Sequence, residues 1–181
     1  MMRLAKDEAL LLFVDVQGRL HELMDGKAEL DAALERLVRG AALLGLPRIV
    51  TEQIPEKLGG TNEPFASLLE GVPVIAKHTF SCLGEPRFVE ALRATGRRQV
   101  ILCGIETHVC IYQTALDLLA EGFEVCVAAD AVSSRRAENR RLALEEMARS
   151  GAAVLPVESI LFALLRDAAD PAFRDLLKLI K

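Results

Sequence analysis

The sequence predicts a three-layer α-β-α fold, in which a six-stranded, mainly parallel sheet carries helices on both faces. Three observations support this expectation. Six short apolar runs punctuate the chain. Consecutive runs begin roughly 24–39 residues apart, which leaves room for a crossover helix each time. Amphipathic patterns that end at glycines fill most of the gaps, and this alternation is typical of a Rossmann-like parallel sheet.

The six apolar runs are the expected strands. Most of them are near-continuously hydrophobic, as strands buried on both faces must be. They cover residues 9–15, 48–51, 72–76, 99–103, 124–129 and 152–154. In sheets of this kind, ligands bind at the carboxyl ends of the strands. Residues at the end of each run, or just after it, are therefore the candidates for chemistry.

Helical patterns occupy the intervening segments. Apolar residues recur at helical spacing before four glycines that suit helix ends, namely Gly45, Gly96, Gly122 and Gly151. Near the C-terminus, residues 160–165 and the Asp170-Pro171 pair predict two more helices. Residues 53–69 are the exception, because their prolines and glycines predict a loop with one short helix near residues 65–69.

Composition and charge limit the class of protein. A chain of 181 residues suits one domain over residues 1–181, and an apolar fraction of 51% supplies a core. The net charge of −4 gives no basic surface for nucleic acid or for an anionic membrane. No apolar run reaches transmembrane length. The first run stops at Asp15, too early for a signal peptide, so a cytoplasmic protein with reduced thiols is expected.

Several common catalytic motifs are missing from the sequence. It contains no GxGxxG and no GxxxxGK[ST], so the phosphate-binding devices of dinucleotide and P-loop proteins are absent. It contains no GxSxG, which argues against a serine hydrolase with a nucleophile elbow. The three histidines, His21, His78 and His108, are widely separated and do not have metal-site spacing. The sequence therefore predicts no cofactor and no bound metal.

Three side chains able to act as base, cation and nucleophile follow strand ends, namely Asp15, Lys77 and Cys110. Cys110 is expected in the first turn of the next helix, where free N–H groups and the helix dipole favour thiolate. Equally, it suits a small buried hydrophobe. His108 is two residues earlier and cannot face Cys110 on a helix, so Asp15 is the better base. As alternatives, Asp15 suits a helix cap and Lys77 a solvent-reaching strand end; Asp130 suits a cap or turn acceptor.

Four motifs, in order along nearly the whole chain to about residue 158, carry a family resemblance. They are residues 13–17 (FVDVQ), Lys77 with Phe80-Ser81, residues 104–110 (GIETHVC) and residues 130–135 (DAVSSR). Each is weak alone, but together they resemble the isochorismatase-like cysteine hydrolases. Residues 51–59 (TEQIPEKLG) and 104–110 most resemble the small isochorismatase-domain subgroup of bacteria and eukaryotes, whose substrates are mostly undefined.

The resemblance implies a catalytic triad of Asp15, Lys77 and Cys110. It also implies a non-proline cis peptide bond between Ile105 and Glu106, a rare feature that persists mainly at functional sites. The backbone N–H groups of Glu106 and Cys110 would form the oxyanion hole. Four residues are candidates for the substrate pocket, although each suits a rim or packing role as well: Gln53, Phe80, Glu106 and Tyr112.

Two departures from the family narrow the expected chemistry. Nicotinamidases of this superfamily carry an Asp and two His as metal ligands after the second strand, whereas residues 51–60 here contain neither residue type. True isochorismatases, which cleave a vinyl ether, lack the nucleophilic cysteine that Cys110 supplies here. The resemblance therefore favours a cysteine-dependent, amidase-like hydrolase that cleaves an amide or related C–N bond of a small molecule through a thioester.

Two alternatives stay open. A non-catalytic oligomeric binding or scaffold protein would share the fold, but it would tolerate loss of the triad. An isochorismatase-type vinyl ether hydrolase is the other alternative. The expected partners are a small-molecule substrate and further copies of the chain. The last helix has an apolar face that suits a second subunit as well as the core, formed by Phe173, Leu176, Leu177 and Ile180.

Overall fold

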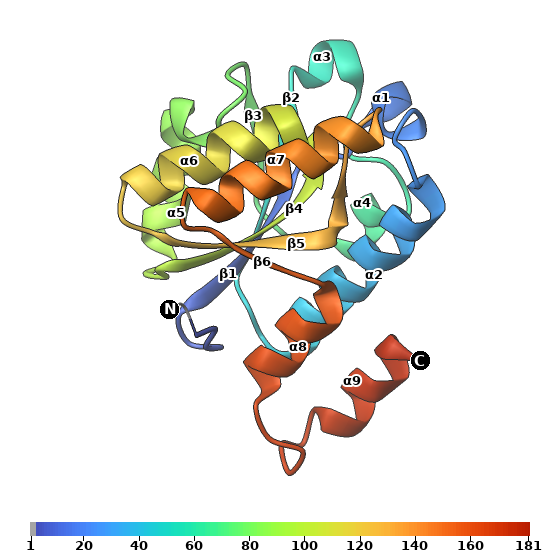
Figure 1. Ribbon diagram of the computed structural model, residues 1–181, viewed down its shortest axis with the longest axis vertical. Coiled ribbons are helices and arrows are strands. Elements are labelled where there is room, and N and C mark those ends of the chain that lie inside the picture. The colour runs from blue at the N-terminus through green and yellow to red at the C-terminus, as the bar shows by residue number, and fades with distance from the viewer. Residues whose placement is uncertain (1–2) are drawn as a thin grey trace.

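The computed structural model describes residues 3–181 and shows six strands with helices on either side (Figure 1). The strands are β1 (Ala9–Val14), β2 (Arg48–Gln53), β3 (Val74–Lys77), β4 (Gln99–Ile105), β5 (Glu124–Ser133) and β6 (Ala153–Leu155). The helices are α1 (Gly18–Glu22), α2 (Lys27–Leu43), α3 (Pro55–Leu58), α4 (Phe65–Leu68), α5 (Pro86–Ala94), α6 (Tyr112–Ala120), α7 (Ala137–Arg149), α8 (Val157–Leu165) and α9 (Phe173–Ile180). None of the helices in the described part of the chain is both long and apolar enough to cross a membrane.

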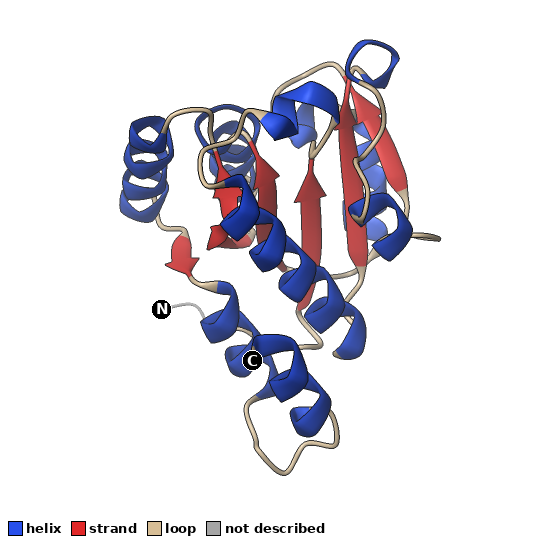
Figure 2. Cartoon of the chain, turned by 90° about the vertical axis from the view of Figure 1, so that its right-hand side faces the viewer, coloured by secondary structure: helices blue, strands red, loops and turns tan. Residues whose placement is uncertain are grey.

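The strands form one sheet in the order β3-β2-β1-β4-β5-β6, and every pairing is parallel. The predicted six-stranded α/β fold is thereby confirmed. In Figure 2 the long arrows of the sheet point to the upper end of the molecule, where the carboxyl ends of these strands meet. The register sets Val14, the last residue of β1, beside Thr51 and Gly104. The residues that follow β1, β2 and β4 therefore lie close together.

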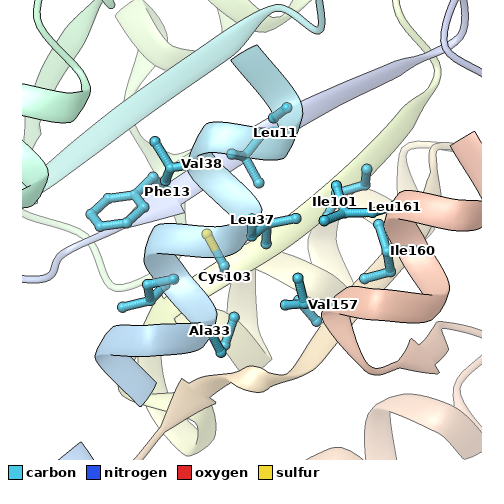
Figure 3. Packing of buried hydrophobic residues seen from close by; sticks show 14 of the residues in the cluster. Leu11, Phe13, Ala33, Leu37, Val38, Ile101, Cys103, Val157, Ile160 and Leu161 are labelled. Atoms are coloured by element: carbon cyan, nitrogen blue, oxygen red, sulfur yellow. The ribbon is translucent and has the colours of Figure 1, made fainter. Parts of the chain in front are cut away.

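Alternate residues of β1 support two separate cores, one on each face of the sheet. Leu11 and Phe13 pack against α2 and α8 (Figure 3), and Leu176 of α9 joins the same cluster. Leu10 and Leu12 point to the opposite face, where α5, α6 and α7 cover them. Each such side chain contributes roughly 1.5–3 kcal/mol when fully buried. Strand β1 is thus fixed from both faces, which holds the residue that follows it in place.

Most of the expected strand limits are off by one or two residues, and β2 and β4 extend to Gln53 and Ile105. Three differences have identifiable local causes. Strand β3 begins at Val74 rather than at residue 72, because Pro73 has no N–H to give to the sheet. Strand β5 continues beyond residue 129, because its pairing with β4 is interrupted after Val127 and resumes at Val132 with a shifted register, so Asp130 does not end the strand. The expected loop over residues 53–69 contains α3 as well as the predicted short helix α4, since Pro55 suits a first helical position.

Gly104 is the residue that allows β4 to approach β1 beside the site. Its φ is +115°, and a Cβ atom there would lie 2.0 Å from the carbonyl oxygen of Val14. No real Cβ makes such a contact, and the obstacle is backbone, which cannot rotate away. Side chains at this position are therefore excluded both by backbone conformation and by space.

We expect Gly104→Ala to destabilise the protein severely, by more than the roughly 1 kcal/mol that a left-handed φ alone costs. Gly96→Ala is the matched control, because Gly96 has a φ of +66° but open space around the added Cβ. Urea unfolding of both variants measures the difference. Equal stability of the two would contradict the close contact between β4 and β1.

Candidate active site

The structure brings together Asp15, Lys77 and Cys110 from three different strand ends. Asp15 follows β1 with a φ of +54°, and Lys77 is the last residue of β3. Strand β2 lies between β1 and β3, so the lysine stem reaches across it to the carboxylate. The Lys77 Nζ atom lies 2.6 Å from Asp15 Oδ2, and both side chains are buried. Cys110 and Asp15 line the same cavity.

The Lys77 ammonium group is surrounded by acceptors. Besides Asp15, it donates to Gln53 Oε1 at 2.6 Å and to the carbonyl oxygens of Thr79 and Phe80, each at 3.2 Å. Burial on its own lowers the pKa of Lys77, but the negative charge of Asp15, with smaller contributions from two thiols, outweighs it and leaves the pKa above its usual value. Lys77 is therefore a cation throughout the neutral pH range.

A second pair of residues, Thr51 and Cys82, holds the Asp15 carboxylate from the other side. The Thr51 hydroxyl donates to Asp15 Oδ1 at 2.8 Å, and the Asp15 N–H donates to the Thr51 carbonyl at 3.0 Å. The Cys82 thiol donates to the Thr51 hydroxyl at 3.8 Å. Because the Thr51 hydroxyl accepts from Cys82, its own proton is free to be donated to Asp15. Each oxygen of Asp15 thus has one fixed donor.

Sequence reasoning did not find these two residues. Cys82 is fully buried in a single 3₁₀ turn (Cys82–Gly84), where its N–H donates to the Thr114 hydroxyl. A signal was available for Thr51, because Thr51 and Gln53 alternate on β2 and so point to the same face. That face also receives Lys77, through Gln53.

Cys110 does not have the environment expected of a resting thiolate. It lies in a π-helical turn (Thr107–Ile111), and regular α-helix starts only at Tyr112. Burial, followed by the negative charge of Asp15, raises the pKa of Cys110 well above its usual value of 9.0, and the nearby Lys77 only partly opposes this. The expectation of an acidic thiol was therefore wrong. At rest Cys110 is a thiol beside a carboxylate that can accept its proton.

A cavity of about 150 Å³ lies over these groups. It is lined by Asp15, Leu20, Gln53, Leu58, Phe80, Ile105, Glu106, Val109 and Cys110. Three of the four pocket candidates, Gln53, Phe80 and Glu106, are among these residues. The fourth, Tyr112, is not, because it lines a different pocket with His108 and Asn139. The π-helical turn shifts the phase of the helix that follows it, which directs Tyr112 elsewhere.

Glu106 borders the cavity, but its carboxylate is already occupied. The peptide bond between Ile105 and Glu106 is cis. Glu106 Oε2 accepts from the backbone N–H of Arg135 at 3.0 Å and from the Arg135 Nε–H at 3.1 Å. This ion pair connects the turn after β4 with the segment after β5. The Glu106 carboxylate at the cavity wall therefore already has an ionic partner.

Other residues singled out in the sequence lie away from the cavity. His108 contacts Ser134 Oγ at 2.9 Å and Asn139 Nδ2 at 3.3 Å, so both ring nitrogens have partners. His78 is exposed, and Asp130 accepts from the N–H of Val157 at the start of α8, which is a capping role. Within residues 3–181, no group of three or more His, Cys, Asp or Glu side chains has the arrangement of a metal site.

The four buried thiols predict a loss of stability in alkali. Burial raises the pKa of Cys82 to about 11 and that of Cys126 to about 12, and those of Cys103 and Cys110 further. The folded state thus holds these protons more tightly than the unfolded chain. Their contribution is complete below pH 9 and falls by about 1.4 kcal/mol per thiol for each pH unit above it.

We expect the free energy of unfolding to decrease steeply between pH 9 and 11 in urea titrations. In Cys126→Ala the free energy of unfolding should fall less steeply with pH, by the contribution of one thiol. Cys126 is buried away from the cavity, so the substitution leaves the site unchanged. A free energy of unfolding that stays constant up to pH 11, or that falls equally steeply in the variant, would contradict the raised pKa values of the buried thiols.

Comparisons with known proteins identify the family. The Isochorismatase domain family matches residues 9–159. Isochorismatase domain-containing protein 1 of Salmo salar is 42% identical over 92% of this chain, which spans only 59% of that relative. The secreted isochorismatase effector Isc1 of Phytophthora sojae is 40% identical over 99% of this chain and 87% of its own length.

Solved structures agree in fold over the whole chain. YcaC from Pseudomonas aeruginosa, solved with hexane-2,5-diol and covalent acrylamide, has a TM-score of 0.92 at 30% identity and covers 98% of this chain and 91% of its own. YcaC from Escherichia coli, described as an octameric hydrolase of unknown specificity, has a TM-score of 0.93 at 28% identity and covers 99% and 91%. These matches show that the chain belongs to the isochorismatase domain family.

Proposed function

We propose that the protein is a cysteine-dependent hydrolase that cleaves an amide or related C–N bond of a small molecule through a thioester on Cys110. One observation carries the proposal: a carboxylate, Asp15, that is held by a buried lysine and lies with a cysteine at the wall of one cavity. A nucleophile, a base beside it and a group that orients the base are the recurring parts of covalent hydrolysis.

Acylation begins with transfer of the Cys110 thiol proton to Asp15 as the sulfur attacks the substrate carbonyl carbon. The raised pKa of the thiol means that this transfer accompanies attack rather than preceding it. The new oxyanion rests on the backbone N–H groups of Glu106 and Cys110, the proposed oxyanion hole. Asp15 then returns the proton to the nitrogen, the C–N bond breaks, and the amine or ammonia leaves.

Deacylation uses the same groups in reverse. Asp15, again a carboxylate, takes a proton from water, and the hydroxide attacks the thioester carbonyl. The C–S bond breaks, Cys110 regains the proton, and a carboxylic acid is released. Lys77 keeps its charge through both steps and holds the Asp15 carboxyl group in place by the contact at Oδ2. The chain's own residues supply every proton transfer, and no cofactor takes part.

The covalent acrylamide in YcaC from P. aeruginosa supports this proposal, because acrylamide is a small amide and a reagent for thiols. A screen of small amides for released ammonia or amine, by a coupled assay, tests it. Release that depends on Cys110 is the expected result. Cleavage of vinyl ethers instead, or binding without turnover of any amide, would favour the alternative activities.

We further propose that the chain acts in the cytoplasm as a homo-oligomer. All four cysteines are unpaired, as is usual in reducing compartments, and YcaC of E. coli is described as an octamer. Helix α9, at the end of the molecule opposite α1 and α3 in Figure 1, keeps Leu177 and Ile180 only half-buried. Light scattering tests the oligomer and cell fractionation the location. A monomer, or export like that named for the P. sojae relative, would contradict one or the other.

Thr51 has a predicted role as a positioning residue for Asp15. Thr51→Val keeps the shape and removes the donor to Asp15 Oδ1, so we expect kcat to fall by about tenfold and the acidic limb of the pH–rate profile to move to higher pH. Thr51→Ser keeps the hydroxyl and should restore both. A lower kcat with an unmoved profile would show that Thr51 serves packing alone.

A further inference from the structure

The charges at the cavity wall are already neutralised. Asp15 and Glu106 are the titratable carboxylates that line it. Asp15 is paired with Lys77, which is fully buried behind it, and Glu106 is paired with Arg135. Neither cation is part of the lining. A substrate carboxylate would therefore meet two carboxylates and no free cation, and a substrate cation would meet anions that already have partners.

The polar side chain of Gln53, which also lines the cavity, is uncharged, and each of its two polar atoms already has a partner. Its Oε1 accepts from Lys77 at 2.6 Å, and its Nε2 donates to the carbonyl of His78 at 2.7 Å. The remaining walls are apolar side chains from five separate elements or turns, namely Leu20, Leu58, Phe80, Ile105 and Val109. Phe80 and Leu58 are also among the exposed large apolar residues, so the mouth is apolar as well.

The cavity is small. At about 150 Å³ it lies below the 300–1,000 Å³ that is common for ligand pockets. Cavities of about this size in other proteins hold benzene, which has six non-hydrogen atoms. The carbonyl group and a short carbon chain therefore fill it, and a longer chain extends out of the mouth.

We propose that the substrate of this site carries a short, uncharged and apolar acyl group. The acyl group and the amide nitrogen together have about six non-hydrogen atoms. This inference rests on the proposed hydrolase function for turnover. Its basis is the match between an apolar wall with paired charges and a neutral ligand, because a charged group moved against such a wall loses hydration without gaining an ionic partner. The site should select among substrates by their acyl group, since the reacting carbonyl must lie at Cys110.

Pairs of amides that differ in charge but not in shape test the substrate class. Propionamide and glycinamide form one pair, and isovaleramide and malonamate form another. We expect kcat/KM to be at least about 100-fold higher for the uncharged member of each pair. Equal or higher values for a charged member would overturn the inference and leave the hydrolase function standing. If none of the four amides is cleaved, the hydrolase function fails on this class, and the alkylation test below decides the inference alone.

Alkylation of Cys110 tests the cavity without requiring turnover. Iodoacetamide and iodoacetate differ mainly in charge. Each forms a bond from Cys110 sulfur to carbon and releases iodide, while the thiol proton passes to Asp15 or water. We expect iodoacetamide to modify Cys110 at least about tenfold faster than iodoacetate at pH 7.5, after division by the same ratio for glutathione. Peptide mass spectrometry reads the site.

A charge added to the wall should change this preference. Leu58→Arg places a cation at the apolar mouth and, with 37% of Leu58 already exposed, leaves the core intact. It should raise the relative rate with iodoacetate by about tenfold. Leu142→Arg, on α7 and outside the cavity lining, is the matched control and should leave the ratio unchanged. A normalised ratio near one in the native protein, or no modification of Cys110 by either reagent, would overturn the proposed substrate class.

Discussion

Replacement of Cys110 by alanine should reduce hydrolysis of any amide found in the screen to the background rate. The substitution removes the nucleophile and little volume, so the fold should persist with a thermal midpoint near that of the native protein. Asp15→Asn keeps the shape but removes the proton acceptor, and should cost on the order of 10²–10⁴ in rate. The measurement is kcat/KM for both variants.

The two substitutions should also be far from additive, because both residues act in one step. The double variant Asp15→Asn, Cys110→Ala should be little worse than Cys110→Ala alone. Thermal unfolding of each protein is the control for fold. Near-normal activity in a folded Cys110→Ala protein would refute covalent catalysis and bring the vinyl ether or scaffold alternatives forward.

Lys77→Met should have the second large effect, on stability as well as on rate. It keeps most of the stem but leaves the Asp15 carboxylate buried without its cation. Removing one partner of a buried ion pair costs roughly 3–5 kcal/mol. Activity should fall as well, since Lys77 holds Asp15 in position. Urea unfolding and kcat/KM measure the two effects separately.

Two further proteins give this prediction its controls. Lys178→Met removes an exposed cation paired with Asp175 and should cost less than about 1 kcal/mol. The double variant Asp15→Asn, Lys77→Met removes both buried charges and should recover much of the lost stability while staying inactive. If Lys77→Met were as stable as Lys178→Met, the buried pair would not hold the site together.

The sheet was predictable because its strands are buried on both faces, and such strands have a continuous apolar signature. The limits of the strands were harder to predict, because they depend on local features of the chain. Pro73 delays β3, and the register shift between Leu102 and Gly104 extends β5 beyond Asp130. Apolar periodicity reports which face is buried and does not report where a strand pairs again after an irregularity.

The sequence likewise predicted some residues of the site and missed others. The strand ends, together with the family resemblance, led to Asp15, Lys77 and Cys110. In the structure Asp15 and Cys110 line one cavity, and Asp15 forms an ion pair with Lys77. Thr51 and Cys82 were missed because their contact depends on where the turn after β3 packs against α6. The assumed thiolate at Cys110 required a regular helix N-terminus, whereas the turn there is π-helical.

Trapping of an acyl-enzyme shows whether hydrolysis passes through a thioester on Cys110. The protein is mixed with the best uncharged amide, or with p-nitrophenyl butyrate as an activated ester, quenched in acid within one turnover and digested for peptide mass spectrometry. We expect an acyl group on Cys110 that hydroxylamine removes and that the Cys110→Ala protein never acquires. Turnover at full rate with no acyl group on Cys110, or with the acyl group on another residue, would contradict it.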